Sequence, residues 1–137
     1  MSLAAFDTVT DKLRAIPPML PALMRAEKVG KKASCFDFEN AELVMDKVAE
    51  ELCELSEAID SGDKACIEEE MGDLLLTLTS LCRKIGVEPE VALNKATDKF
   101  IGRFSVLENA VSEQGKDINS MSMTELDAVW EEIKHKK

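Results

Sequence analysis

The fold of this chain is decided by the stretch NAELVMDKVAEELCELSEAIDSGDKACIEEEMGDLLLTLTSLCRKI, which occupies residues 40–85. Its first part, residues 40–59, carries an apolar stripe at helical spacing, formed by Val44, Val48, Leu52, Leu55 and Ile59. Its last part, residues 64–85, has an apolar surface wider than one stripe, which is typical of a helix buried on two sides. The turn Asp60-Ser61-Gly62-Asp63 joins the two parts. Because this connection is short, we expect two antiparallel helices that pack side by side.

Further helices are predicted on both sides of this hairpin. Residues 22–33 have a helical pattern with a basic surface. Pro89 stands in a first-turn position and starts a helix that runs to about residue 113. Ser122-Met123-Thr124-Glu125 is a capping box, which predicts a last helix through Trp130.

The pattern as a whole indicates an all-α protein, because strand-type alternation is nearly absent. Residues 1–18 are mixed and end in Ile16-Pro17-Pro18, which favours an extended entry over a continuous helix. We therefore predict a leader or linker over residues 1–18 and a single domain over residues 19–137. That domain is expected to be a helical bundle of about five helices, with a four-helix core completed by homodimerisation because the helix at 64–85 is so broadly apolar.

The charge of the chain is concentrated in one segment. The 137 residues carry a formal net charge of −10, and residues 39–73 hold 13 acidic side chains against two basic ones. A protein that binds nucleic acid directly would show a basic stripe instead. The sequence contains no apolar run of about 18 residues that would predict a membrane span. Its N-terminus does not have the pattern of a signal peptide. Four cysteines without a CxxC pair favour reduced thiols packed as small hydrophobic side chains. We expect a cytoplasmic protein.

Two acidic pairs on the hairpin are the strongest functional signal. Glu51 and Glu54 are three residues apart and share one face of the first helix, and Glu70 and Asp73 do the same on the second. If the helices are antiparallel neighbours, all four carboxylates can face one another and repel, so a cation should offset their charge. Oxygen ligands without histidine or thiolate select Mg²⁺ or Mn²⁺.

The plainer interpretation is that these glutamates form an ordinary solvated helix surface. Gly72 argues against that interpretation, because glycine inside a helix costs up to about 1 kcal/mol relative to alanine. A neighbour or a ligand that approaches the helix closely would explain it. From the residues alone, both interpretations stay open.

The spacing of these acidic residues resembles the defining pattern of the MazG branch of the all-α NTP pyrophosphohydrolases. That pattern is Glu-Glu-x-x-Glu, here at residues 50–54, followed by Glu-x-x-Asp, here at residues 70–73. Four more segments resemble the family, at residues 20–26, 36–38, 94–104 and 126–134. Full-length relatives often carry two tandem copies of the domain, and this chain resembles the C-terminal copy.

The resemblance implies a role for nine residues. Magnesium would be held by Glu51, Glu54, Glu70 and Asp73, while Glu50 would orient or deprotonate the attacking water. The triphosphate would be contacted by Lys47, Lys99 and Arg103, and Trp130 would stack on the nucleobase. Without the resemblance, the three basic residues would be interpreted as surface charges and Trp130 as a core anchor.

The implied activity is magnesium-dependent hydrolysis of NTPs or dNTPs to the monophosphate and pyrophosphate by metal-activated water, with nucleotide-pool house-cleaning as the expected role. Cys66 departs from the pattern, because relatives often have a basic residue there that helps to hold phosphate. The alternative is a non-catalytic dimeric bundle whose acidic face docks a basic partner. A di-metal carboxylate oxidase would need Glu-x-x-His pairs, and the chain has one histidine, His135.

Overall fold

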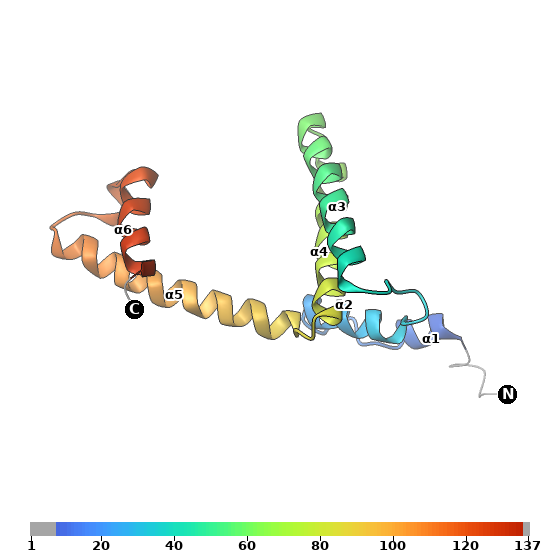
Figure 1. The fold of residues 1–137 in the computed structure, drawn as a ribbon. Coiled ribbons are helices and arrows are strands. Elements are labelled where there is room, and N and C mark those ends of the chain that lie inside the picture. The colour runs from blue at the N-terminus through green and yellow to red at the C-terminus, as the bar shows by residue number, and fades with distance from the viewer. Residues whose placement is uncertain (1–7, 136–137) are drawn as a thin grey trace. The chain divides into compact units, whose positions relative to one another are not determined.

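The structure is a computed structural model that describes residues 8–135, and this part of the chain is all-α, as predicted, without a strand. Figure 1 shows its elements, which are α1 (Val9–Arg14), α2 (Ala22–Lys32), α3 (Ala41–Ser61), α4 (Lys64–Lys84), α5 (Pro89–Glu113), the 3₁₀ helix η2 (Ile118–Ser120) and α6 (Met123–His135). The chain divides into two compact units, Met1–Val91 and Ala92–Lys137, and each is described by itself. The domain boundaries at residues 18 and 19 stay a prediction.

Helix α1 was not predicted, because the sequence favoured an extended segment before the prolines. The side chain of Thr8 caps its first turn by accepting a hydrogen bond from the backbone N–H of Asp11 at 3.0 Å. The helix ends at Arg14, before Pro17 and Pro18, which lack the N–H groups that a continuing helix would need. The two prolines therefore do interrupt the helix, but a short capped helix forms ahead of them.

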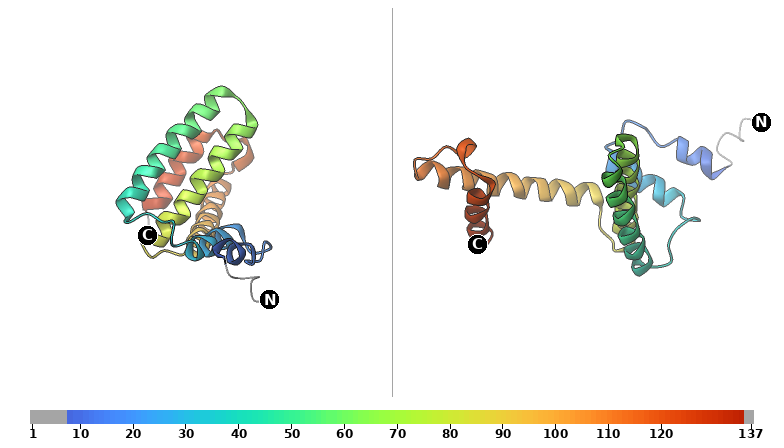
Figure 2. Two further views of the ribbon diagram at one scale, coloured as in Figure 1. Left: turned by 90° about the vertical axis from the view of Figure 1, so that its right-hand side faces the viewer. Right: turned by 90° about the horizontal axis from the view of Figure 1, so that it is seen from above.

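The hairpin of α3 and α4 forms as the sequence predicts. Asn40 caps α3 by accepting a hydrogen bond from the backbone N–H of Leu43, and Asp63 caps α4 in the same way. Between them, Gly62 ends α3 with a positive φ of 74°, a conformation that glycine adopts without strain. The two helices lie side by side (Figure 2), and residues from both form the core of this unit, namely Val44, Leu55, Ala58 and Leu74.

Helix α4 packs against two neighbours, which confirms the expectation drawn from its broad apolar surface. It lies between α3 and α2. Part of its apolar surface nevertheless stays exposed, because Leu75 and Leu76 keep about half of their surface accessible, at 48% and 53%. On α3, Leu52 and Ile59 are similarly exposed.

The homodimer stays a prediction, and these exposed apolar side chains are the reason to expect it. Burying apolar surface contributes about 25 cal/mol per Å², and association of two chains would bury part of the surface of these side chains. Light scattering at micromolar concentration should therefore give about twice the 15.1 kDa mass of one chain. A mass of one chain would contradict the homodimer.

The segment between α2 and α3 is held to α4 by ion pairs that the sequence did not reveal. Asp37 accepts a hydrogen bond from Nη2 of Arg83 at 2.8 Å, and its other carboxylate oxygen lies 3.2 Å from Nζ of Lys84. The guanidinium of Arg83 also lies against the backbone of α2 at Gly30, where a Cβ atom would collide with it. The hydrogen bond from Arg83 is the main reason why the pKa of Asp37 falls from 3.8 to about 2.

We expect Asp37→Asn to lower the free energy of unfolding by roughly 1–3 kcal/mol at neutral pH, because Arg83 would keep its burial and lose its anionic partner. Since the pKa of Asp37 is lowered in the folded state, its contribution to stability is complete above its unfolded value near 4 and disappears as the pH falls towards 2. Urea unfolding of parent and variant from about pH 7 to about pH 2.5 measures this. A difference between them that stays constant over this range would contradict the assignment.

The second unit consists of α5 from Ala92 onward, η2 and α6. The predicted capping box is confirmed, because Ser122 Oγ accepts from the backbone N–H of Glu125, whose carboxylate accepts from the N–H of Ser122. Leu107 and Val111 are its most deeply buried apolar side chains. The ring of Phe100 packs against Trp130 with centroids 5.4 Å apart.

Two further expectations concern the membrane and the cysteines. None of the helices that the structure describes is long and apolar enough to cross a bilayer. All four cysteines are free in the structure, and their reduced state stays an expectation. Their expected packing is wrong, since Cys35, Cys53 and Cys66 are exposed and only Cys82 is half-buried.

Candidate metal centre

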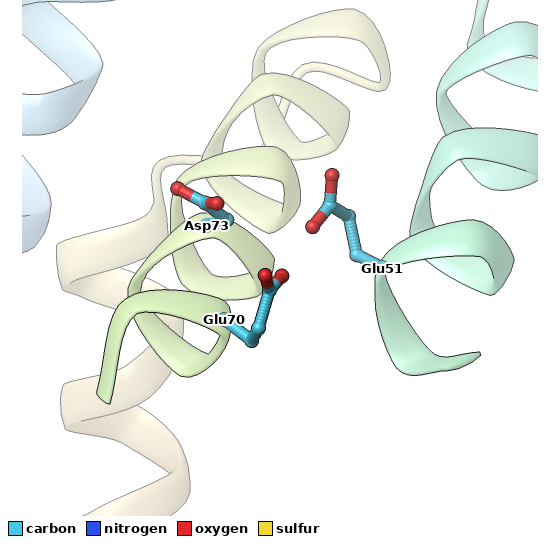
Figure 3. A group of neighbouring side chains, drawn as sticks. All are labelled: Glu51, Glu70 and Asp73. Carbon is cyan, nitrogen blue, oxygen red and sulfur yellow. The ribbon is translucent and has the colours of Figure 1, made fainter. Parts of the chain in front are cut away.

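Three of the four predicted ligand residues come together between α3 and α4. Glu51 extends from α3 toward Glu70 and Asp73, which lie one turn apart on α4 (Figure 3). Each offers one carboxylate oxygen, and these oxygens all lie within 4.8 Å of one another. The antiparallel packing of the hairpin therefore brings residues about 20 positions apart in the sequence to one place, as the spacing of the acidic pairs predicted.

The burial of the three carboxylates differs in a way that suits a cation. Glu51 is 5% exposed, Glu70 is half-buried and Asp73 is exposed. Oε2 of Glu51 and Oε2 of Glu70 are both buried without a hydrogen-bond partner. A buried carboxylate oxygen without a partner is costly, and a divalent cation that takes oxygen ligands would satisfy both atoms. The residues present therefore fit a metal ion. On the side of the exposed Asp73, such an ion would be open to solvent.

Lys47 lies at this cluster and brings a positive charge to it. Its Nζ lies 3.2 Å from Oε1 of Glu51 and 3.3 Å from Oε1 of Glu50. Hydrogen bonds to Glu51 and then to Glu50 raise the pKa of the Lys47 ammonium. The resemblance implied that Lys47 contacts a triphosphate, and these two ion pairs were not predicted. The four-residue spacing between Lys47 and Glu51 was a local signal for one of them.

Glu54 lies near the cluster but outside the group of three. Its pKa is raised, chiefly by the negative charge of Glu51 and further by burial and by Glu70. The carboxylate of Glu54 is therefore close enough to interact electrostatically with those of Glu51 and Glu70. Its role as a fourth ligand stays a prediction. The side chain of Glu50 is 59% exposed and pairs with Lys47, and its role as the base also stays a prediction.

Cys66 occupies the first turn of α4, where the sequence analysis noted a departure from the family. Its Sγ lies 3.5 Å from a carboxylate oxygen of Asp63, and this contact raises the pKa of the thiol. A thiol that is held protonated carries no charge. The structure therefore has an uncharged side chain where the resemblance led us to expect a basic one.

The other three predicted residues belong to the second unit. Trp130 lines an apolar cavity of about 520 Å³, together with Phe100, Phe104, Leu107, Met123, Leu126 and Asp127. Arg103 lines a different cavity of about 350 Å³, whose wall includes Val106 and Val129. Lys99 is exposed on α5. Contacts of these residues with a nucleotide stay predictions, and the contact of Trp130 with Phe100 also suits the alternative of a core anchor.

Two antiparallel helices with facing, partly buried carboxylates and no histidine or thiolate among the donors define the class: an all-α protein with a carboxylate site for a hard divalent cation. The family follows from comparison with known proteins. Residues 39–106 match the family model of the MazG nucleotide pyrophosphohydrolase domain, and the chain belongs to this family. The match contains every predicted site residue except Trp130.

Two curated relatives extend the similarity over most of the chain. The nucleoside triphosphate pyrophosphohydrolase/pyrophosphatase MazG of Thermotoga maritima is 39% identical over 127 residues, which is 91% of this chain and 49% of that protein. The nucleoside triphosphate pyrophosphohydrolase of Escherichia coli K12 is 38% identical over 126 residues, which is 89% of this chain and 48% of that protein. The chain thus spans about half the length of the curated relatives it matches.

Proposed function

We propose that this chain hydrolyses nucleoside triphosphates between the α- and β-phosphates and releases a nucleoside monophosphate and pyrophosphate. The observation that carries this proposal is the group of three carboxylates with two buried, unpartnered oxygens, in a domain of the MazG family. The activity for which the two relatives are named supports the reaction and the triphosphate substrates. We further propose that the protein acts on free nucleotides in the cytoplasm and does not bind nucleic acid.

In the proposed site, Glu51, Glu70 and Asp73 would hold Mg²⁺ or Mn²⁺, with Glu54 as a fourth ligand. The ion would neutralise phosphate charge and lower the pKa of water. Glu50 is next to the most buried ligand residue and largely exposed, so its carboxylate can accept the proton of the attacking water.

The resemblance to the family also implies substrate contacts for three basic side chains and for Trp130. Lys47, Lys99 and Arg103 stabilise the charge that develops on the triphosphate, and Trp130 stacks on the base. Water adds to the α-phosphorus as the bond from that phosphorus to the bridging oxygen breaks, and pyrophosphate leaves with that oxygen. Positioning and charge stabilisation account for most of the expected rate, since no covalent nucleophile takes part.

The rival function is a non-catalytic bundle whose acidic face docks a basic partner. A docking face would expose its charges to the partner, whereas Glu51 is 5% exposed and points into the hairpin (Figure 3). The buried oxygens of Glu51 and Glu70 therefore favour a small ion over a protein surface.

The test is a panel of NTPs and dNTPs, with pyrophosphate and phosphate measured separately. We expect pyrophosphate release with Mg²⁺ or Mn²⁺ and none with EDTA. The preferred base and sugar in this panel would also separate house-cleaning of damaged nucleotides from control of a signalling nucleotide. Absence of turnover across the panel at saturating Mg²⁺ would support the docking function instead.

A further inference from the structure

Glu51 uses its two carboxylate oxygens differently. Oε1 accepts the ammonium of Lys47 at 3.2 Å, whereas Oε2 is buried and has no partner. The side chain of Glu51 is 94% buried, since 6% of its surface is exposed, and it belongs to the group with Glu70 and Asp73. In the most buried carboxylate of the cluster, one oxygen is therefore paired with a lysine of the same chain and the other oxygen lacks a partner.

The ammonium of Lys47 offsets part of the negative charge that a bound cation would otherwise offset. Three carboxylates with oxygens within 4.8 Å of one another repel in the absence of a cation. Lys47 lies one helical turn before Glu51 on α3, so its ammonium reaches both Glu51 and Glu50 without any change of backbone. A lysine suits this position, because its compact ammonium sits on a flexible stem and can leave one partner for another.

We propose that Lys47 is a built-in counter-ion of the metal-free cluster and competes with the divalent cation for Glu51. When a cation binds the cluster, repulsion weakens the pair between Lys47 and Glu51, and the ammonium is released toward Glu50 and the substrate phosphates. This inference rests on the proposed function and deepens it. Its consequence is an order of binding, because Lys47 becomes available to a triphosphate after the cation has bound.

The test compares Lys47→Met with Lys31→Met in the full chain. Lys31 pairs with Glu27 at 3.8 Å on α2 and serves as a matched control for the loss of one helical lysine–glutamate pair. Calorimetric titration with Mg²⁺, without nucleotide, should show binding to Lys47→Met that is tighter than the parent by at least about fivefold, because the competing charge is gone. Without metal, Lys47→Met should melt at a lower temperature than the parent. Lys31→Met should show the Mg²⁺ affinity of the parent, and so should Lys47→Arg, which keeps the charge.

Two further outcomes keep the inference apart from the proposed function. If the parent binds Mg²⁺ and releases pyrophosphate but Lys47→Met has unchanged or weaker Mg²⁺ affinity, the counter-ion role is wrong and the proposed function stands. If the parent binds no Mg²⁺, both are wrong.

A second measurement needs no variant and decides the question if Lys47→Met does not fold. Mass spectrometry of the parent after brief acylation should show that Lys47 reacts faster at saturating Mg²⁺ than in EDTA, while Lys31 reacts equally in both. Equal labelling of Lys47 in both conditions would overturn the inference.

Discussion

Replacing Asp73 by asparagine should lower the rate of NTP hydrolysis by about 100-fold or more, while the protein stays folded. The substitution keeps the shape of the side chain and removes one of the three clustered charges. A bound metal contributes several kcal/mol of charge stabilisation, and about 1.4 kcal/mol corresponds to a tenfold change in rate. Steady-state kinetics at saturating Mg²⁺ measures the loss.

The stability of this variant separates a functional aspartate from a structural one. Asp73 is exposed, and the hydrogen bond that Thr77 donates within α4 goes to the backbone carbonyl of residue 73, so asparagine leaves that bond in place. With one repelling carboxylate fewer, the metal-free variant should be as stable as the parent, or more stable by a few tenths of a kcal/mol. Glu69→Gln is the matched control, because it removes one exposed charge from the same helix outside the cluster. Parental turnover in Asp73→Asn would show that Asp73 is solvated surface.

Mg²⁺ or Mn²⁺ should raise the thermal stability of the parent, and this is the second large effect we expect. The cluster of Glu51, Glu70 and Asp73 exists only in the folded hairpin, so a cation that binds there stabilises the folded state. At a concentration of 100 times Kd the gain is about 2.7 kcal/mol. Ca²⁺ should stabilise less or support less turnover, because it tolerates looser geometry.

Thermal melts with EDTA and with each ion measure this gain, and Asp73→Asn should gain less from Mg²⁺ than the parent does. A Tm that is indifferent to 10 mM Mg²⁺, taken as roughly 100 Kd or more for a functional site, would count heavily against the metal centre.

The limits of α3, α4 and α5 could be predicted closely because local signals mark them. Asn40 and Asp63 cap the two helices of the hairpin, Gly62 ends the first, and Pro89 begins α5 where the sequence analysis placed it. Each of these residues acts within one turn of its own position. A single sequence contains all the information that such signals need.

Contacts between distant segments were beyond the same reasoning. Asp37 and Arg83 are 46 residues apart, and neither charge indicates its partner. The exposure of three cysteines was also missed, because a helical pattern predicts which residues share a face and does not say which faces are covered. The one missed contact with a local signal is the pair of Lys47 and Glu51, which are four residues apart on one helix.

The candidate site was predictable to the extent that it depends on the hairpin. Antiparallel packing was enough to bring Glu51 toward Glu70 and Asp73. The roles of Glu54 and Glu50 depend on side-chain geometry around an ion, which helical periodicity does not determine. The roles of Lys99, Arg103 and Trp130 come from the resemblance to the family, and these residues lie in the second unit.

Phosphorus NMR of an NTP incubated with the parent protein tests the proposed reaction most directly, because it identifies the bond that breaks. With Mg²⁺, we predict that the triphosphate signals are replaced by those of a nucleoside monophosphate and pyrophosphate, that EDTA prevents the change, and that Asp73→Asn slows it strongly. Nucleoside diphosphate and inorganic phosphate as the products would contradict cleavage between the α- and β-phosphates. Turnover that EDTA leaves untouched would contradict a metal site formed by Glu51, Glu70 and Asp73.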